Sequence, residues 1–193
     1  MSLALSSADQ FNVSTFHGAS ALSAFRAEGL LKRLQAIDSN VSAVRAHFVH
    51  FVATRGALEG PQRKVMEGLL DYGHPAPALD RVDLSCVVVP RLGTVSPWAS
   101  KATDIAHNAG LANVVRMERG IEFQLTFKKG LLGGSKLPEG TALQALKAVL
   151  YDRMTETVLP DGFDVKGLFL PLQGKSLQIV ELSEGRNSLV KAN

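Results

Sequence analysis

The residues with the richest chemistry lie in one short polar stretch between two apolar segments. Trp98, the only tryptophan, stands there among serine, lysine, aspartate and histidine. Lys101, Asp104 and Asn108 recur at helical spacing and would share one helix face, with His107 beside it. A polar face behind a Ser/Thr-rich helix start can dock another domain or hold an anionic ligand. The predicted interdomain or substrate-side surface consists of Ser96, Trp98, Ser100, Lys101, Asp104, His107 and Asn108.

The same stretch also admits a purely structural interpretation. Ser96 could cap a helix, Pro97 suits its first turn, and Trp98 could fill a gap in a core. Asp104 could serve only as the ion-pair partner of Lys101. The residue types alone leave both interpretations open.

Other candidate groups are better explained as structural. Cys86 lies in the apolar run 84–89, where a core residue is expected and nothing nearby would lower the thiol pKa. His47 and His50 are three apart on a predicted strand and should face opposite sides, which disfavours a metal pair. Residues 129–136 lack the G-x-x-x-x-G-K-[ST] spacing of a phosphate loop, so a turn is the better account. We therefore expect no metal site and no catalytic residue in this chain.

Hydrophobic periodicity predicts an α+β fold with a sheet covered by helices. Strand patterns occur at 11–17, 44–52, 84–89 and 115–127. Helical stripes occur at 27–37, 65–72, 102–108 and 143–150. The unit strand-helix-strand-helix is thus found twice at an offset of about 75 residues, as in an internal duplication. The strand at 44–52 is apolar on both sides and should be covered on both faces.

Composition limits the classes of partner and compartment. The 193 residues carry a formal charge of +3, with Lys and Arg scattered among the acids, so neither a nucleic acid nor a membrane is expected as a partner. A single cysteine excludes an internal disulfide and suits a reducing cytosol. No apolar run reaches the ~18 residues of a membrane helix, and the N-terminus lacks signal-peptide features. We expect a cytoplasmic protein.

Several motifs identify a family resemblance. The longest is P-R-L-G-T-V-S-P-W-A-S-K-A-T-D-I-A-H-N-A-G-L at 90–111, and shorter ones lie at 21–26, 47–52, 118–120, 152–154 and 184–186. In this order they resemble the N-terminal region of the large, single-chain phosphoribosylformylglycinamidine synthase, the glutamine-dependent ligase of purine biosynthesis. The chain departs from the family pattern at Ala99, where serine is usual, and at Ala109, where cysteine is usual. The resemblance covers most of the chain.

The resemblance implies a fold and a division into domains. The family's N-terminal domain looks like two fused copies of the small accessory subunit of the multi-subunit enzyme, so a PurS-like domain is expected at 1–159. Residues 160–193 would form a linker and the truncated start of the next domain. Glycine and proline increase after Leu159, and the last residues resemble a helix start without a C-terminal cap. We therefore expect a fragment of a longer enzyme.

The resemblance also implies where catalysis takes place. ATP and Mg²⁺ would serve the full-length enzyme in its synthetase region, and glutamine would be cleaved in a glutaminase region. Both regions are the expected partners of this chain, which should bind no cofactor and be inactive alone.

Two other functional classes remain open. The duplicated pattern permits a free-standing α+β interaction or ligand-binding module. The segment 119–125 is weakly similar to the R-G-aromatic strand of an RNA-recognition domain. This class is disfavoured because Ile121 replaces the stacking aromatic and Glu122 adds a negative charge.

Overall fold

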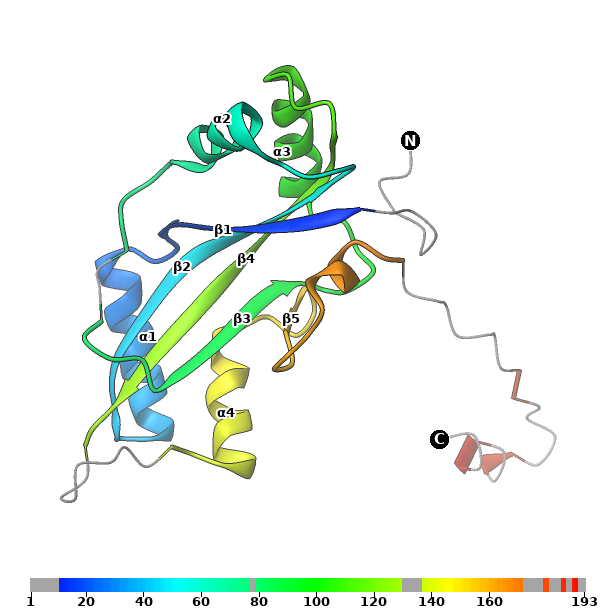
Figure 1. Cartoon of the computed structure of the whole chain (residues 1–193). Helices are drawn as coiled ribbons and strands as arrows, with labels where there is room; N and C mark the ends of the chain where they lie inside the picture. Colours follow the sequence, from blue (N-terminus) through cyan, green and yellow to red (C-terminus); the bar gives the residue numbers. More distant parts are fainter. Residues whose placement is uncertain are drawn as a thin grey trace.

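The structure, a computed structural model, describes residues 11–76, 79–129 and 137–171, with short pieces at 179–180, 185–186 and 189–190. Within these residues, a five-stranded antiparallel sheet of order β1-β2-β4-β3-β5 packs against four α-helices (Figure 1). The α+β prediction is therefore confirmed. In chain order the elements are β1 (Asn12–Ser20), α1 (Ala24–Ile37), β2 (Val41–Thr54), α2 (Gly60–Leu70), β3 (Leu84–Pro90), α3 (Pro97–Asn108), β4 (Val114–Phe127), α4 (Gly140–Leu150), β5 (Glu156–Val158) and the 3₁₀ helix η1 (Val165–Leu168).

The two longest strands form the centre of the sheet. β2 and β4 pair along almost their whole length, from Val41↔Phe127 to Thr54↔Val114. β1 flanks β2, and β3 flanks β4. The order strand-helix-strand-helix recurs as β1-α1-β2-α2 and β3-α3-β4-α4, as the sequence pattern predicts. The similarity of each strand-helix-strand-helix unit to the small accessory subunit of the multi-subunit enzyme stays a prediction.

The α-helices pack on one face of the sheet in two pairs. α1 and α4 cover an apolar cluster that includes Ala46 of β2 and Phe123 of β4. α2 and α3 cover a second cluster, which includes Val52 and Met117 of the same two strands. Ala46 and Val52 have the same parity on β2 and so lie on one face. Each pair combines one helix from each repeat, so neither repeat completes a core by itself.

The opposite face of the sheet is covered in part by the chain that follows β5. Val49, Phe51 and Ala53 of β2 pack there against Leu168 and Phe169, and η1 lies over this side of the sheet (Figure 1, orange). β2 is thus covered on both faces, as expected from its sequence. The contact ties residues beyond 159 to the sheet, while the domain boundary at 159/160 stays a prediction.

Strand β4 departs from what its sequence pattern indicates. Its apolar residues alternate with polar ones, which is typical of a strand with one face in solvent, yet Arg116 and Glu118 on the polar face are both 3% exposed. The pairing register shifts between Ala53 and Thr54, so that Val115 has no partner of its own on β2. The segment that returns after β5 then covers this part of the polar face. A pattern within one strand cannot reveal such cover from a distant segment.

Some predictions fall outside the described residues. These are the turn over 130–136 and most of the helix start at 183–193. Along the described ranges, no helix has the length and apolarity required to cross a bilayer.

Candidate functional site

Helix α3 carries the predicted surface. Its first turn is formed by Ser96 and Pro97, the two residues whose types suit a helix start. The Ser96 hydroxyl accepts a hydrogen bond from the Ala99 amide at 3.1 Å, and Pro97 occupies the first turn. Serine is a preferred N-cap, and the fixed φ of proline suits the first helical position. Ser96 as a cap is confirmed, and α3 begins earlier than the predicted 102–108.

A buried ion pair fixes the start of α3 to the sheet. Ser96 donates to Glu118 through its hydroxyl at 2.8 Å and through its backbone amide at 3.3 Å. Glu118 Oε1 lies 3.6 Å from Arg116 Nε. Arg116 in turn donates to the Leu168 carbonyl and lies over the Phe169 ring, 5.0 Å from its centroid. The pair thus connects the N-terminus of α3 with the segment that follows β5.

Burial acts on both charges of this pair. It raises the pKa of Glu118, against the hydrogen bonds from Ser96 and the charge of Arg116. It lowers the pKa of Arg116, against the charge of Glu118. Removing one partner would leave the other charge buried without its counter-ion, which is strongly destabilising. Ser96 is therefore a structural residue that faces inward, more than part of an outer surface.

Trp98 lies over a polar-aromatic cluster formed with His50, Tyr72 and Arg119. The Trp98 and His50 ring centroids are 5.6 Å apart, and the Arg119 guanidinium lies 5.0 Å from the Trp98 ring centroid. Arg119 donates to the Tyr72 hydroxyl at 3.3 Å, and that hydroxyl lies 2.6 Å from His50 Nε2. Burial, with the nearby charge of Arg119, lowers the pKa of His50 to about 4. His50 is therefore neutral at pH 7, and its Nε2 can accept the Tyr72 proton.

An apolar groove runs between α2 and α3 beside this cluster, and we call it the α2–α3 groove. Its volume is about 290 Å³. Ile105 on its rim is 55% exposed, an unusual position for so large an apolar side chain. Exposed apolar surface rimmed by polar residues is typical of an interaction site. The groove is lined by Leu69, Leu70, Tyr72, Trp98, Lys101, Ala102, Ile105 and Met117.

The structure divides the predicted surface residues into separate groups. Only Trp98 and Lys101 line the α2–α3 groove. Asp104, His107 and Asn108 are exposed on the same helix, whereas Ser100 is half-buried. His107 Nε2 lies 2.7 Å from the Val114 carbonyl and so connects the end of α3 to β4. Within the described residues no ion pair joins Lys101 to Asp104. Sequence reasoning missed Ile105, although an isoleucine one turn after Lys101 on a polar face is a readable signal.

The interpretation of Cys86 as a core residue is confirmed. Cys86 is buried, and burial raises the pKa of its thiol to about 11, so it is a core residue without nucleophilic character. Ile121 packs against the apolar cluster under α1 and α4. It cannot belong to an exposed RNA-stacking platform.

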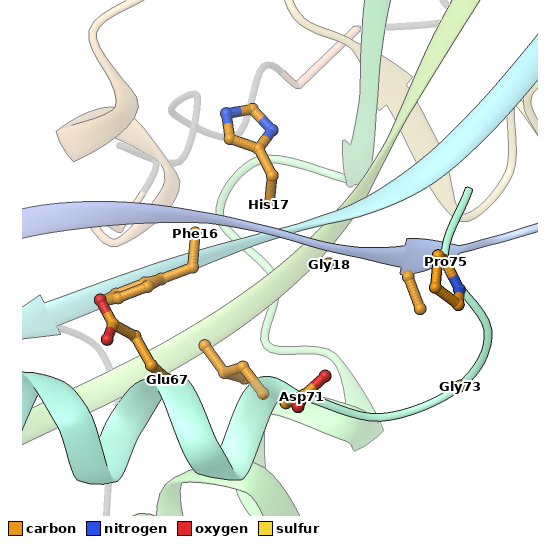
Figure 2. A pocket seen from close by; sticks show the side chains of 9 residues that line it. Phe16, His17, Gly18, Glu67, Asp71, Gly73 and Pro75 are labelled. Atoms are coloured by element: carbon orange, nitrogen blue, oxygen red, sulfur yellow. The ribbon is translucent and has the colours of Figure 1, made fainter. Parts of the chain in front are cut away.

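A second hollow lies between β1 and α2, with a volume of about 310 Å³ (Figure 2). Phe16 points from β1 toward α2, while its neighbour His17 points to the opposite side of the strand. Glu67 in this hollow is paired with Arg63 at 3.0 Å. The carboxylate is thus used by an ion pair on the helix itself. On β1, Phe16 therefore faces the α-helices, and His17 faces the opposite side of the sheet, which the α-helices do not cover.

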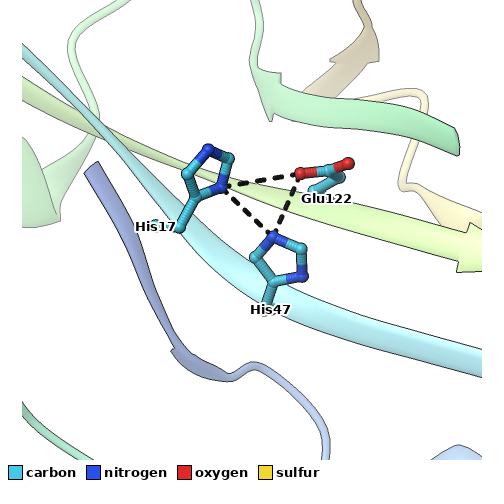
Figure 3. Close-up of side chains that lie close together, drawn as sticks. All are labelled: His17, His47 and Glu122. Carbon is cyan, nitrogen blue, oxygen red and sulfur yellow. Dashed lines mark hydrogen bonds and ion pairs between the residues drawn. The ribbon is translucent and has the colours of Figure 1, made fainter. Parts of the chain in front are cut away.

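On that face, His17, His47 and Glu122 form a trio from β1, β2 and β4 (Figure 3). His47 Nε2 lies 3.0 Å from Glu122 Oε2 and 3.3 Å from His17 Nδ1. His17 Nδ1 lies 3.7 Å from the same Glu122 oxygen. Across the part of the chain that the structure describes, this is the one group of three side chains that could hold a metal ion. His47 and His50 face opposite sides as predicted, yet His47 meets a histidine from another strand.

The pKa values within the trio follow from burial and from its neighbours. Burial lowers the pKa of His47, against the charge of Glu122. Burial alone would raise the pKa of Glu122, but hydrogen bonds from Ser85 and Gln124 and the two histidines hold it below its ordinary value. At pH 7 the trio therefore offers a carboxylate and a neutral His47.

Residues 47–169 match the family described as formylglycinamide ribonucleotide amidotransferase N-terminal. The matched range starts in β2 at His47 and ends at the buried Phe169, so it includes the α2–α3 groove and the buried pair Arg116–Glu118. It leaves out β1 and α1.

Proposed function

The chain belongs to the formylglycinamide ribonucleotide amidotransferase N-terminal family, and from this premise we propose that it is the N-terminal scaffold domain of phosphoribosylformylglycinamidine synthase. The whole enzyme would convert formylglycinamide ribonucleotide, glutamine and ATP to formylglycinamidine ribonucleotide, glutamate, ADP and phosphate. ATP, Mg²⁺ and glutamine would bind to other regions of that enzyme. This chain would contribute a docking surface and help to enclose the path of ammonia.

The α2–α3 groove is the observation that carries the docking proposal. It joins an exposed isoleucine, a half-buried tryptophan and a lysine of α3 with two leucines of α2. Aromatic and aliphatic anchors surrounded by charge are the usual centre of a specific protein interface. The polar-aromatic cluster beneath Trp98 holds the floor of the groove in one arrangement, which lowers the entropy lost on docking. The synthetase region is the partner we propose for this groove.

A scaffold role agrees with the chemistry of the described residues. The Cys86 thiol is buried with a raised pKa, and the neutral His50 is enclosed between Tyr72 and Trp98. Neither can attack glutamine. We expect the isolated chain to release no glutamate from glutamine above a buffer blank, and measurable release would contradict the scaffold role.

Docking can be tested by reconstitution. The purified chain is mixed with a separate polypeptide that carries the synthetase and glutaminase regions, and binding is measured by calorimetry. Ile105→Asp should weaken binding at least about tenfold, because a charge in the apolar centre of an interface is costly to desolvate. Phe25→Asp is the matched control, since Phe25 is 85% exposed on α1, away from the groove. Equal binding by both variants would place the interface elsewhere.

A further inference from the structure

The arrangement of His17, His47 and Glu122 is suited to binding a cation. Three atoms that carry lone pairs, two imidazole nitrogens and one carboxylate oxygen, face one another within 3.0–3.7 Å (Figure 3). A point about 2.0–2.1 Å from all three atoms exists just outside their plane, and this is the length of Zn–N and Zn–O bonds. A tetrahedral ion with such bonds requires ligand atoms separated by about 3.3 Å. The trio has this spacing without any movement of the backbone.

Neighbouring side chains orient the carboxylate of the trio. Glu122 Oε1 accepts hydrogen bonds from the Ser85 hydroxyl at 2.7 Å and from Gln124 Nε2 at 3.0 Å. Arg45 donates to the amide oxygen of Gln124, which fixes the side of Gln124 that faces Glu122. Oε2 is thereby left for the two histidines. Such outer hydrogen bonds are typical of carboxylates that bind metals.

The ligand types select the metal. Two imidazoles and one carboxylate suit Zn²⁺ and its neighbours, whereas Mg²⁺ and Ca²⁺ take six or more oxygen ligands. His47 and Glu122 side chains are 8% and 16% exposed, and the His17 side chain is 66% exposed. His47 and Glu122 are thus held in place by their buried surroundings, and the exposed His17 completes the set of ligands from the surface. His17 and Glu122 line a hollow of about 400 Å³ on this face, which leaves room for a water as fourth ligand.

We propose that His17, His47 and Glu122 bind one Zn²⁺ ion with a fourth position open to water. The ion would join β1, an edge strand of the sheet, to β2 and β4. His17 lies outside the range that matches the family, and the trio shares no residue with the α2–α3 groove, so the proposed site is independent of the docking proposal.

The test uses the 193-residue chain prepared without a histidine tag. Zn²⁺ titration should give one site with a Kd of about 1 µM or tighter, and Co²⁺ should show the strong visible absorption of a tetrahedral complex. A Zn²⁺ concentration 100 times the Kd should raise Tm by about 5–10 °C, because the ion binds only the folded state.

Variants separate the trio from adventitious binding. His17→Ala and Glu122→Gln should each weaken Zn²⁺ binding at least about tenfold and abolish the Co²⁺ absorption. The exposed position of His17 makes its variant safe for folding, whereas His47 is buried. His74→Ala, an exposed histidine outside the trio, should bind as the wild type does. The proposal is overturned if the wild type binds no Zn²⁺ below about 100 µM, or if His17→Ala and Glu122→Gln bind it as tightly as the wild type.

Discussion

The two helix pairs cover the same sheet face but differ in what they enclose. Beneath α1 and α4 the buried side chains are apolar, and Phe123, Leu125 and Leu146 are among them. Beneath α2 and α3 the apolar cluster adjoins His50, Tyr72 and Arg119, and a groove opens between the helices. The α1–α4 half is closed and uniform, whereas the α2–α3 half combines polar contacts with exposed apolar surface.

The comparison shows how repeated elements can serve different purposes. Ser23 begins α1 and Ser96 begins α3, and each hydroxyl accepts from the backbone amide three residues later. Only Ser96 also donates to a buried carboxylate. The local design is the same in both repeats, but in the second repeat it is connected to charges in the core. We infer that the α1–α4 half mainly stabilises the fold and that the α2–α3 half mainly presents the groove.

The largest expected effect is in the α1–α4 half. Phe123 is 4% exposed, and Phe123→Asp removes a core aromatic and buries an unpaired carboxylate. Loss of the aromatic ring lowers the free energy of unfolding by about 3–5 kcal/mol, and the buried carboxylate lowers it by several more. The total free energy of unfolding of a typical domain is only about 5–15 kcal/mol. The variant should unfold or aggregate, as measured by circular dichroism and thermal melting. An unchanged Tm would show that this half does not carry the stability, with Phe25→Asp as the exposed control.

The next effect is a pH dependence that belongs to the α2–α3 half. Burial and the charge of Arg119 lower the pKa of His50 to about 4, below its ordinary 6.5. The unfolded state therefore binds more protons in this interval, and stability that is present above pH 6.5 is lost as the pH falls toward 4. The loss attributable to His50 is about 3 kcal/mol. Urea unfolding of the wild type and of His50→Gln should diverge in this window, since glutamine can still accept from Tyr72 but does not titrate. Parallel pH profiles would contradict the assignment.

A smaller effect compares the two serine caps. Ser23→Ala removes one cap bond at an exposed site and should cost about 1 kcal/mol. Ser96→Ala removes the cap bond and the hydroxyl that donates to Glu118, so it should cost about 2–3 kcal/mol. The two changes in the free energy of unfolding are measured side by side. Equal costs would mean that the buried pair does not depend on Ser96.

Local features of this molecule could be predicted from sequence, and contacts between distant segments could not. Periodicity identified the principal helices and strands. It placed the start of α3 too late, at residue 102, whereas the types of Ser96 and Pro97 indicated the true start. The interior position of Cys86 followed from its apolar neighbours. Each of these inferences needs only a few adjacent residues, because caps and alternation are local properties.

The features that could not be predicted depend on the order of the strands and on distant segments that cover the sheet. The trio arises because β1 and β4 both flank β2. His47 pairs with Glu122 on β4 and lies two residues from Val49, the partner of His17 on β1. The burial of Arg116 and Glu118 depends on the chain that returns after β5, and the short strand β5 has too few residues for a pattern. Ile105 was not predicted because the chemistry of its helix face is carried mainly by polar residues, among which a single isoleucine stands out little. The prediction of the site was therefore limited mainly by unknown strand pairing and by the packing of distant segments, and less by the interpretation of residue types.

The smallest effect on stability should accompany a clear effect on docking. Lys101 and Asp104 are exposed on α3, and Lys101 lines the α2–α3 groove. Substitution of such surface residues usually shifts stability by no more than about 0.5 kcal/mol. If the groove binds the synthetase region, Lys101→Ala or Asp104→Ala should reduce glutamine-dependent synthesis in the reconstituted enzyme while Tm stays unchanged. A charge at an interface acts mainly on association and orientation, so the loss should be modest and depend on salt. Synthesis is measured with glutamine and, separately, with free ammonia, because a loosened domain that leaks ammonia would impair only the first. Wild-type rates in both assays for both variants would leave α3 as a well-capped helix with a polar outer face, and the division of roles between the two halves would fail at this point.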